Sequence, residues 1–263
     1  MRGIIKSVLA HPLTKCLELD DPNTTELRLQ IIQSKPFLRR IYDDWYRLIK
    51  SKIPEGDGLV LELGSGAGYF QKFLPSVIQS EVFLCRNVHL VADSRHLPFP
   101  NSSLKAIVMT DVLHHIPQVD VFLQEAVRCL VPAGRLVMVE PWVSPWSRFV
   151  YRHLHHEPFI PDTTSWEIPT RGPLSGANGA LPWVVFVRDR EILRRQFPQL
   201  EVEEVSPMMP FRYLVSGGLS LRSFAPAWTF GLWRHIERAV EPWIDQLAMF
   251  GHVVLQRTAS GKG

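Results

Sequence analysis

The chain has 263 residues, of which 46% are hydrophobic, and its 29 basic and 26 acidic residues give a formal net charge of +3. This composition excludes a disordered chain, because enough apolar residues are present to bury a core, and so mild a charge does not call for a polyanionic partner. Three cysteines without CxxC spacing indicate neither a disulfide framework nor a zinc site. We expect a cytoplasmic protein, since no signal-peptide pattern and no run of about 18 apolar residues occurs.

Residues 1–57 are expected to form an N-terminal helical cap. The turn sequence D-P-N-T at residues 21–24 leads into apolar positions with helical spacing, and Thr24 is a candidate N-cap. This spacing predicts one or two amphipathic helices, broken near Pro36. The helices either cover the mouth of a site or pack on the edge of a sheet, and residues 58–263 are expected to form the main domain.

Residues 59–70, L-V-L-E-L-G-S-G-A-G-Y-F, join a buried strand to a glycine loop. Gly64, Gly66 and Gly68 allow tight turns and close approach of a ligand to backbone amides, and a helix expected near Tyr69 would offer its positive end. The pattern predicts a nucleotide-like ligand. A dinucleotide is disfavoured, because G-x-G-x-x-G requires glycine where Tyr69 stands.

Two acidic residues accompany the glycine loop. Glu62 lies two residues before the first glycine, and Glu81 follows Glu62 by 19 positions, the spacing expected for an acid on a ribose diol. An ionised carboxylate only accepts hydrogen bonds, so Glu81 suits two hydroxyl donors. Its alternative role is that of an exposed acid at the end of the second strand.

The second and third strands are expected at residues 77–83 and 88–92. Only residues 84–87 separate them, whereas parallel neighbours normally need a crossover of a dozen or more residues. We therefore predict that the crossover helix is missing and that the third strand is short or irregular.

The later elements alternate between strand and helix, which predicts a doubly wound α/β sheet. Residues 211–247 are too long for a hairpin and are expected to be a helical insertion. The remaining expected elements are strand four at 104–110, a helix at 119–130, strand five at 135–140, a helix at 188–197, strand six at 200–206 and strand seven at 249–257.

Four segments in register resemble the type 11 branch of the class I S-adenosylmethionine (SAM) dependent methyltransferases. They are E-L-G-S-G-A-G at 62–68, V-A-D-S-R-H-L-P-F-P at 91–100, L-K-A-I-V-M-T-D-V-L-H-H-I at 104–116 and F-L-Q-E-A-V-R-C-L-V-P-A-G-R-L-V-M-V-E-P at 122–141. The resemblance implies a Rossmann-like sheet of seven strands in the order 3-2-1-4-5-7-6, with strand seven antiparallel. It also implies a SAM-binding core at 58–141. Beyond the resemblance, an acceptor-side lid and insertion are expected within 142–248.

The same resemblance implies SAM as cofactor and assigns its contacts. Glu81 would bind the ribose, Asp93 and the amide of Ser94 the adenine, and Thr110 and Asp111 the methionine portion. Asp93 is otherwise a turn residue, Asp111 a cap of the following turn, and Glu62 acts either directly or by holding the loop amides. The full implied set is Glu62, Gly64, Ser65, Gly66, Gly68, Glu81, Val82, Asp93, Ser94, Thr110 and Asp111.

Methyl transfer is an in-line displacement, so positioning and exclusion of water supply most of the acceleration. A hydroxyl acceptor would add a need for a base, for which His115 and His155 are the candidates. Both have other readings, because L-H-H-I is common in the type 11 branch and H-L-H-H-E at 153–157 is otherwise solvated or structural. No metal is expected, since Ile160 stands where an H-E-x-x-H motif needs its second histidine.

The sequence thus predicts a SAM-dependent methyltransferase with a small-molecule or lipid/glycan-type acceptor. The alternatives are a binding or scaffold protein with this fold and, disfavoured by Tyr69, a nucleotide-sugar or dinucleotide enzyme. No nucleic-acid partner is expected, because no N-P-P-Y-like tetrad follows strand four. The aromatic second half indicates an acceptor lid with residues 178–183 as its lip, because turn chemistry there precedes an apolar, strand-like run. It could instead make peripheral membrane contact through Trp228, Trp233 and Trp243. The oligomeric state stays open.

Overall fold

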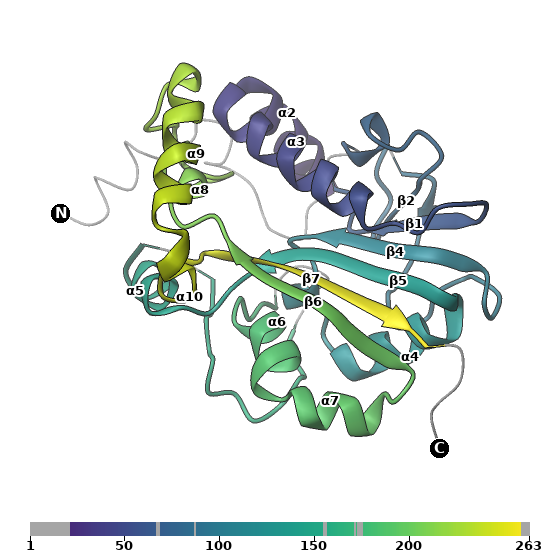
Figure 1. Ribbon diagram of the computed structural model, residues 1–263. Helices are drawn as coiled ribbons and strands as arrows, with labels where there is room; N and C mark the ends of the chain where they lie inside the picture. Colours follow the sequence, from purple (N-terminus) through teal and green to yellow (C-terminus); the bar gives the residue numbers. More distant parts are fainter. Residues whose placement is uncertain are drawn as a thin grey trace.

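A seven-stranded sheet forms the centre of the computed structural model, which describes residues 22–66, 69–86, 88–154, 157–170, 172 and 176–258 (Figure 1). β7 runs antiparallel to both β5 and β6, while the other neighbours are parallel. The predicted strand order and the antiparallel seventh strand are therefore confirmed. Across the sheet the strands are β3 (Leu90–Val91), β2 (Ile78–Glu81), β1 (Leu59–Leu63), β4 (Leu104–Thr110), β5 (Leu130–Pro141), β7 (Phe250–Arg257) and β6 (Leu200–Met208).

The central strands β1 and β4 are mainly apolar because helices cover both faces of the sheet. Leu61 and Ile107 are partners in adjacent strands and belong to one core cluster, with Phe122 of α4 (Val119–Cys129). Val60 and Val108 belong to the other cluster, which α3 (Pro36–Ser51) completes. Alternate side chains along each strand thus point to opposite faces of the sheet and pack into two separate cores.

The N-terminal region forms two helices, α2 (Pro22–Ser34) and α3, as predicted. Pro36 stands at the first position of α3, where its missing N–H is harmless. The expectation that Thr24 is an N-cap is wrong, because α2 begins at Pro22 and the buried Thr24 lies in its first turn. Trp45 of α3 packs on Phe250 of β7 with ring centroids 4.8 Å apart, so this helix lies over the sheet.

The connection from β2 to β3 has no helix among its described residues, as the chain arithmetic predicted. Both strands are shorter than expected. Two hydrogen bonds link the ends of the connection: the backbone amide of Gln79 donates to Nδ1 of the His89 ring, and the backbone amide of His89 donates to the Gln79 carbonyl. The helix expected near Tyr69 is only a single turn, η2 (Phe70–Lys72). The helix dipole therefore adds little to the glycine loop.

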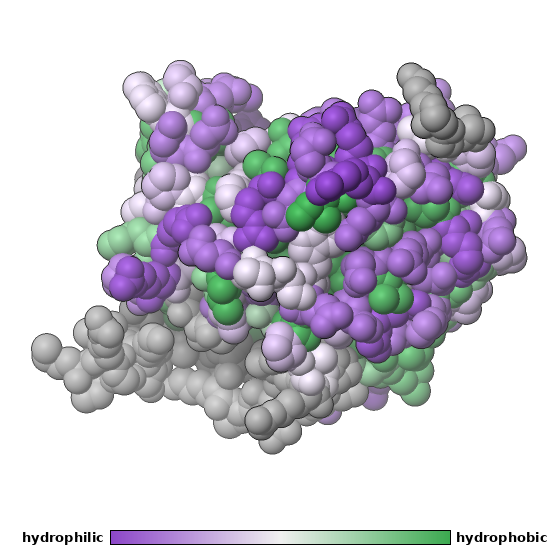
Figure 2. Space-filling model, turned by 90° about the horizontal axis from the view of Figure 1, so that it is seen from below, coloured by the Kyte–Doolittle hydropathy of each residue, from purple (hydrophilic) through white to green (hydrophobic). Residues whose placement is uncertain are grey.

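The apolar run at 184–187, expected to be strand-like, is helical. It lies in η4 (Val184–Arg188), between α6 (Leu181–Trp183) and α7 (Arg190–Gln196), and Val184, Val185 and Phe186 are buried. A short apolar run fits a buried helix as well as a buried strand, so its period alone could not decide. Seen from the side of α4 and α7, the surface is mainly hydrophilic, with small separate hydrophobic groups (Figure 2).

The insertion between β6 and β7 is helical, as predicted. It lies beside α2 and α3 (Figure 1), and the Lys35 ammonium joins the two regions by donating to the carbonyls of Gly218 and of Leu221, the latter at 2.8 Å. None of the described helices is long and apolar enough to cross a bilayer. The remaining helical elements are α5 (Pro145–Leu154), α8 (Arg212–Ser216), η5 (Ala227–Thr229), α9 (Phe230–Ala239), η6 (Glu241–Trp243) and α10 (Ile244–Leu247).

Candidate active site

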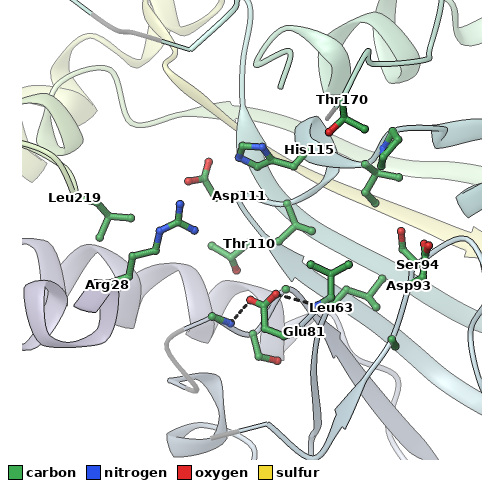
Figure 3. Close-up of a pocket in the computed structure, with 18 of the residues that line it drawn as sticks. Arg28, Leu63, Glu81, Asp93, Ser94, Thr110, Asp111, His115, Thr170 and Leu219 are labelled. Atoms are coloured by element: carbon green, nitrogen blue, oxygen red, sulfur yellow. Dashed lines mark hydrogen bonds between the residues drawn. The ribbon is translucent and has the colours of Figure 1, made fainter. Parts of the chain in front are cut away.

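A cavity of about 500 Å³ lies at the carboxyl ends of β1, β2, β3 and β4, under α2 and α3 (Figure 3). Ligands of doubly wound sheets bind at this edge, and the volume is that of a small-molecule site. Most of the wall comes from the last residues of these strands and the loops that follow them: Leu63, Gly64, Ser65 and Gly66 from β1, Glu81 and Val82 from β2, Ala92, Asp93, Ser94 and Arg95 from β3, and Thr110, Asp111, Val112, His115, Ile116 and Pro117 from β4. The helices α2 and α3 add Arg28, Ile32, Tyr42 and Tyr46, and later segments add Thr170, Gly172 and Leu219.

Glu81 anchors the glycine loop to the end of β2. Its Oε1 accepts a hydrogen bond from the amide of Gly66 at 2.9 Å, and its Oε2 accepts one from the amide of Val82 at 3.1 Å (Figure 3). Gly64 and Gly66 have φ values of 60° and 47°, which other residues adopt only with strain. Burial raises the pKa of Glu81, and the two amides oppose that rise. Gly68 lies outside the described residues.

Glu62 lies beneath the cavity rather than in its wall. Its side chain is almost fully buried, at 3% exposure, and its Oε2 accepts a hydrogen bond from the side-chain amide of Gln79 (Nε2) at 3.3 Å. Burial raises the pKa of Glu62 to about 8. The backbone carbonyl of Glu62 also accepts hydrogen bonds from the hydroxyls of Ser65 and Ser80. This position matches the indirect role, support of the loop.

Asp93 and Ser94 line the cavity, but the Asp93 carboxylate already has a partner. The Arg95 amide donates to Oδ1 at 2.9 Å, and Arg95 Nη2 lies 2.6 Å from Oδ2. The hydrogen bonds from Arg95 hold the pKa of Asp93 below its usual value. The geometry is therefore that of a turn aspartate that also faces the cavity. The sequence reasoning missed Arg95, for which the juxtaposition D-S-R was the available signal.

Asp111 has a strained backbone at the far end of the cavity. Its φ is 63°, and its amide donates to the Val139 carbonyl at 2.8 Å, which ties the end of β4 to β5. A non-glycine residue in this conformation costs roughly 1–2 kcal/mol and is often found at a functional site. Burial raises the pKa of Asp111 to about 6, with His114 opposing the rise. Arg28 extends from α2 toward Asp111 (Figure 3).

Glu140, at the end of β5, organises the turn that follows Asp111. It is fully buried, and its Oε1 accepts hydrogen bonds from the amides of Val112 and Leu113, each at 2.8 Å, while its Oε2 accepts one from His114 Nδ1 at 2.8 Å. The sequence reasoning missed Glu140. Its signal was an acid at the end of an apolar strand, the same signal that identified Glu62.

His114 is buried among three carboxylates. Its Nε2 lies 4.0 Å from Asp111 Oδ1 and 4.0 Å from Glu157 Oε2, on the side opposite Glu140. Burial alone would lower the pKa of His114, but the hydrogen bond to Glu140 and the three negative charges raise it to about 9. The ring is therefore an imidazolium at neutral pH in the absence of another cation.

His115 lies in the cavity wall, whereas His155 is outside the described residues. The Nδ1 of His115 is 3.0 Å from the Gly176 carbonyl, which only accepts, so Nδ1 carries the proton and Nε2 keeps its lone pair. Burial and the neighbouring His114 lower the pKa of His115 to about 3. The ring is neutral and suits acceptance of a hydrogen bond better than storage of a proton.

The expected lip at 178–183 does not line the cavity. Asn178 is buried, its amide donates to the His114 carbonyl at 2.9 Å, and its side chain holds Ile160 and Ala180. Thr170, Gly172 and Leu219 contribute to the wall instead. The segment at 178–183 thus supports the histidine turn from behind, because its apolar residues continue into the core.

Part of the chain matches a known protein family. Residues 61–138 match the family model described as a methyltransferase domain. Demethylmenaquinone methyltransferases from Tropheryma whipplei, strains Twist and TW08/27, are each 38% identical over 63 residues, which cover 22% of this chain and 26% of theirs. The match thus spans about a quarter of the length of these curated relatives.

One solved structure has a similar overall fold. A chain from a complex that contains the Haloferax volcanii Trm112 methyltransferase activator covers 94% of this chain and 100% of its own length, with a TM-score of 0.55 and 14% identity. At this identity the likeness concerns the fold alone. It extends over nearly the whole chain, including regions that the family model does not match.

Proposed function

We propose that the protein transfers a methyl group from SAM to a small-molecule or lipid/glycan-type acceptor, because residues 61–138 match the family model of a methyltransferase domain. The observation that carries the proposal is the hydrogen bond between Glu81 and the Gly66 amide in the cavity wall. This bond holds Glu81, the proposed acceptor for the ribose hydroxyls, next to the glycine loop, whose backbone amides would contact the cofactor.

The proposed cofactor contacts follow the cavity from one end to the other. Glu81 would accept hydrogen bonds from the ribose hydroxyls, Val82 would pack on the adenine, and Asp93 with Ser94 would face the adenine edge. Gly64, Ser65, Thr110 and Asp111 would surround the methionine portion. All of these residues line the cavity, which supports a single ligand in contact with each of them.

SAM supplies an electrophilic methyl group on a sulfonium, with S-adenosylhomocysteine as the leaving group. The chain's own part is to orient the acceptor and exclude water. The Nε2 lone pair of His115 would accept a hydrogen bond from an acceptor hydroxyl, with Nδ1 held by Gly176. Arg28 and Leu219 would bound the acceptor side, since both line the cavity.

The acceptor class remains a proposal. The relatives from Tropheryma whipplei are named for demethylmenaquinone, but the match to them is short, so it supports methyl transfer more than any acceptor. Trp228 and Trp243 are 81% and 57% exposed, which supports peripheral contact with a lipid surface. Free thiols at Cys85 and Cys129 support a cytoplasmic location. No nucleic-acid substrate is proposed.

A thermal-shift titration tests the cofactor. S-adenosylhomocysteine and NAD would be added to the wild type, to Glu81→Ala and to the control Glu191→Ala, whose side chain is 75% exposed on α7. A ligand at 100 times its Kd stabilises the protein by about 2.7 kcal/mol, which raises the Tm by several degrees. We expect this shift with S-adenosylhomocysteine in the wild type and the control, and its loss in Glu81→Ala. No shift in the wild type would favour the scaffold alternative.

A further inference from the structure

Two histidines and two carboxylates converge at the acceptor end of the cavity. His114 and His115 lie on the turn η3 (Leu113–His115), Asp111 precedes that turn, and Glu157 comes from the segment after α5. Single nitrogen or oxygen atoms of His114, His115 and Glu157 all lie within 4.8 Å of one another. Asp111 Oδ1 is 4.0 Å from His114 Nε2, as is Glu157 Oε2. The three atoms of His114, His115 and Glu157 therefore lie around one point, and Asp111 lies beside His114.

The two imidazole rings are already oriented as metal ligands are. Glu140 holds Nδ1 of His114 and the Gly176 carbonyl holds Nδ1 of His115, so each ring has Nε2 left as its ligand atom. Metal-binding histidines commonly donate their other N–H to a carboxylate or a carbonyl, which fixes the tautomer and the ring plane. His114 and Glu140 are fully buried, so this support is rigid.

The charge around this point favours a cation. Asp111, Glu140 and Glu157 bring three carboxylates to the buried ring of His114, so the side chains around it are mainly acidic. Arg28 points toward Asp111 (Figure 3). A divalent ion among His114, His115 and Glu157 would add two positive charges beside these carboxylates.

We propose that His114, His115 and Glu157 bind a divalent first-row transition metal, with zinc as the first candidate. Imidazole nitrogens combined with carboxylate oxygens suit zinc and its neighbours, whereas calcium and magnesium prefer oxygen ligands alone. Ligand atoms in a tetrahedral zinc site are about 3.3 Å apart. The present separations would have to close by about 1 Å, through small side-chain rotations.

The metal would face the acceptor, because His115 and Asp111 line the cavity. Bound to an acceptor oxygen, the ion would lower the pKa of that hydroxyl and favour the nucleophilic alkoxide. This role rests on the proposed function, whereas metal binding itself does not. The cluster also differs from the H-E-x-x-H motif that the sequence lacks, since it takes only Glu157 from that segment and draws its histidines from the turn after β4.

Direct metal binding provides the test. Protein without a histidine tag would be stripped with a chelator and titrated with Zn²⁺ by calorimetry and with Co²⁺ by visible spectroscopy. The variants are His115→Ala and Glu157→Gln, with His235→Ala, an exposed histidine of α9, as the control. We expect one ion per chain in the wild type and the control, and at least 10-fold weaker binding in both site variants.

Two outcomes would overturn the proposal: no saturable 1:1 binding in the wild type, or equal Zn²⁺ affinity in the wild type and both site variants. His114→Ala is not used alone, because its burial makes misfolding a competing explanation. Thermal shifts with S-adenosylhomocysteine, measured on the same samples, report the cofactor site separately. Zinc binding without a thermal shift by S-adenosylhomocysteine would refute the proposed function and support the metal site. A thermal shift by S-adenosylhomocysteine without zinc binding would support the proposed function and refute the metal site.

Discussion

Glu140 Oε2 and His114 Nδ1 meet at 2.8 Å although the residues lie 26 positions apart in the chain. The contact joins the ends of β4 and β5, which are neighbours in the sheet. Because Glu140 also accepts the amides of Val112 and Leu113, one carboxylate sets the conformation of the turn that carries both histidines.

Removal of this carboxylate should destabilise the protein strongly. Glu140→Ala would leave two amides and a buried imidazole without their acceptor, and loss of one partner of a buried ion pair costs about 3–5 kcal/mol. Glu140→Gln keeps one oxygen acceptor and should cost less, about 1–3 kcal/mol. Urea denaturation measures both. An alanine variant within about 1 kcal/mol of the wild type would contradict the assigned role.

The buried Glu62 should make stability depend on pH. Its folded pKa, about 8, lies above its ordinary value of 4.5, so its contribution is fully present below pH 4.5 and is lost as pH rises through about 8. At 1.36 kcal/mol per pH unit the loss is at most roughly 5 kcal/mol. Glu62→Gln should remove this component and be the more stable protein at pH 8.

Asp111 and His114 also have raised pKa values, about 6 and about 9, so the wild-type slope alone is not diagnostic. The difference between the wild type and Glu62→Gln, measured by urea denaturation from pH 5 to pH 9, isolates Glu62. An equal slope in both proteins would show that the Glu62 carboxyl titrates normally in the folded state.

The two described glycines of the loop should respond differently to alanine. A Cβ on Gly64 would lie 2.5 Å from Val112 Cγ2, whereas the nearest atom to a Cβ on Gly66 is 3.6 Å away. Gly66→Ala should therefore cost only the backbone strain, roughly 1–2 kcal/mol. Gly64→Ala adds a clash and should lower the Tm further. Equal Tm values in a thermal melt would argue against this packing.

Lys35 should hold the N-terminal helices against the insertion. Its ammonium donates to the Gly218 and Leu221 carbonyls, and burial lowers the pKa of Lys35 to about 8. Lys35→Met would leave these carbonyls without their donor, a loss of about 1–3 kcal/mol. Limited proteolysis should cut the segment around Leu221 faster in Lys35→Met, but not in Lys50→Met, which changes an exposed residue of α3.

The sequence predicted best where one local pattern allowed one structure. The sequence left four residues between the second and third strands, and the structure leaves eight, residues 82–89, both fewer than a helical crossover needs. The connection without a helix before β3 therefore followed from chain length alone. The motifs after β1 to β4 converge because parallel strands present their carboxyl ends at one edge. The strand order, in contrast, came from the resemblance and not from any periodicity.

Tertiary context decided what the sequence could not. In the run at 184–187 the first three residues are buried and Val187 is 40% exposed, and so short an apolar run carries no period that separates helix from strand. The partnership of Glu140 with His114, and of both histidines with Glu157, depends on how loops from distant segments meet. Arg95 illustrates the same limit at short range, because only the structure shows its guanidinium on Asp93.

The shape of the sheet also protects it from pairing with another chain. β3, at one edge, is only two residues long, too short to serve as a template. The opposite edge, β6, is nine residues long, but it carries exposed acids at Glu201 and Glu203, a register shift between Val202 and Glu204, and Pro207, which has no N–H to offer. The short connection after β2 therefore leads into an edge strand that resists pairing with another chain.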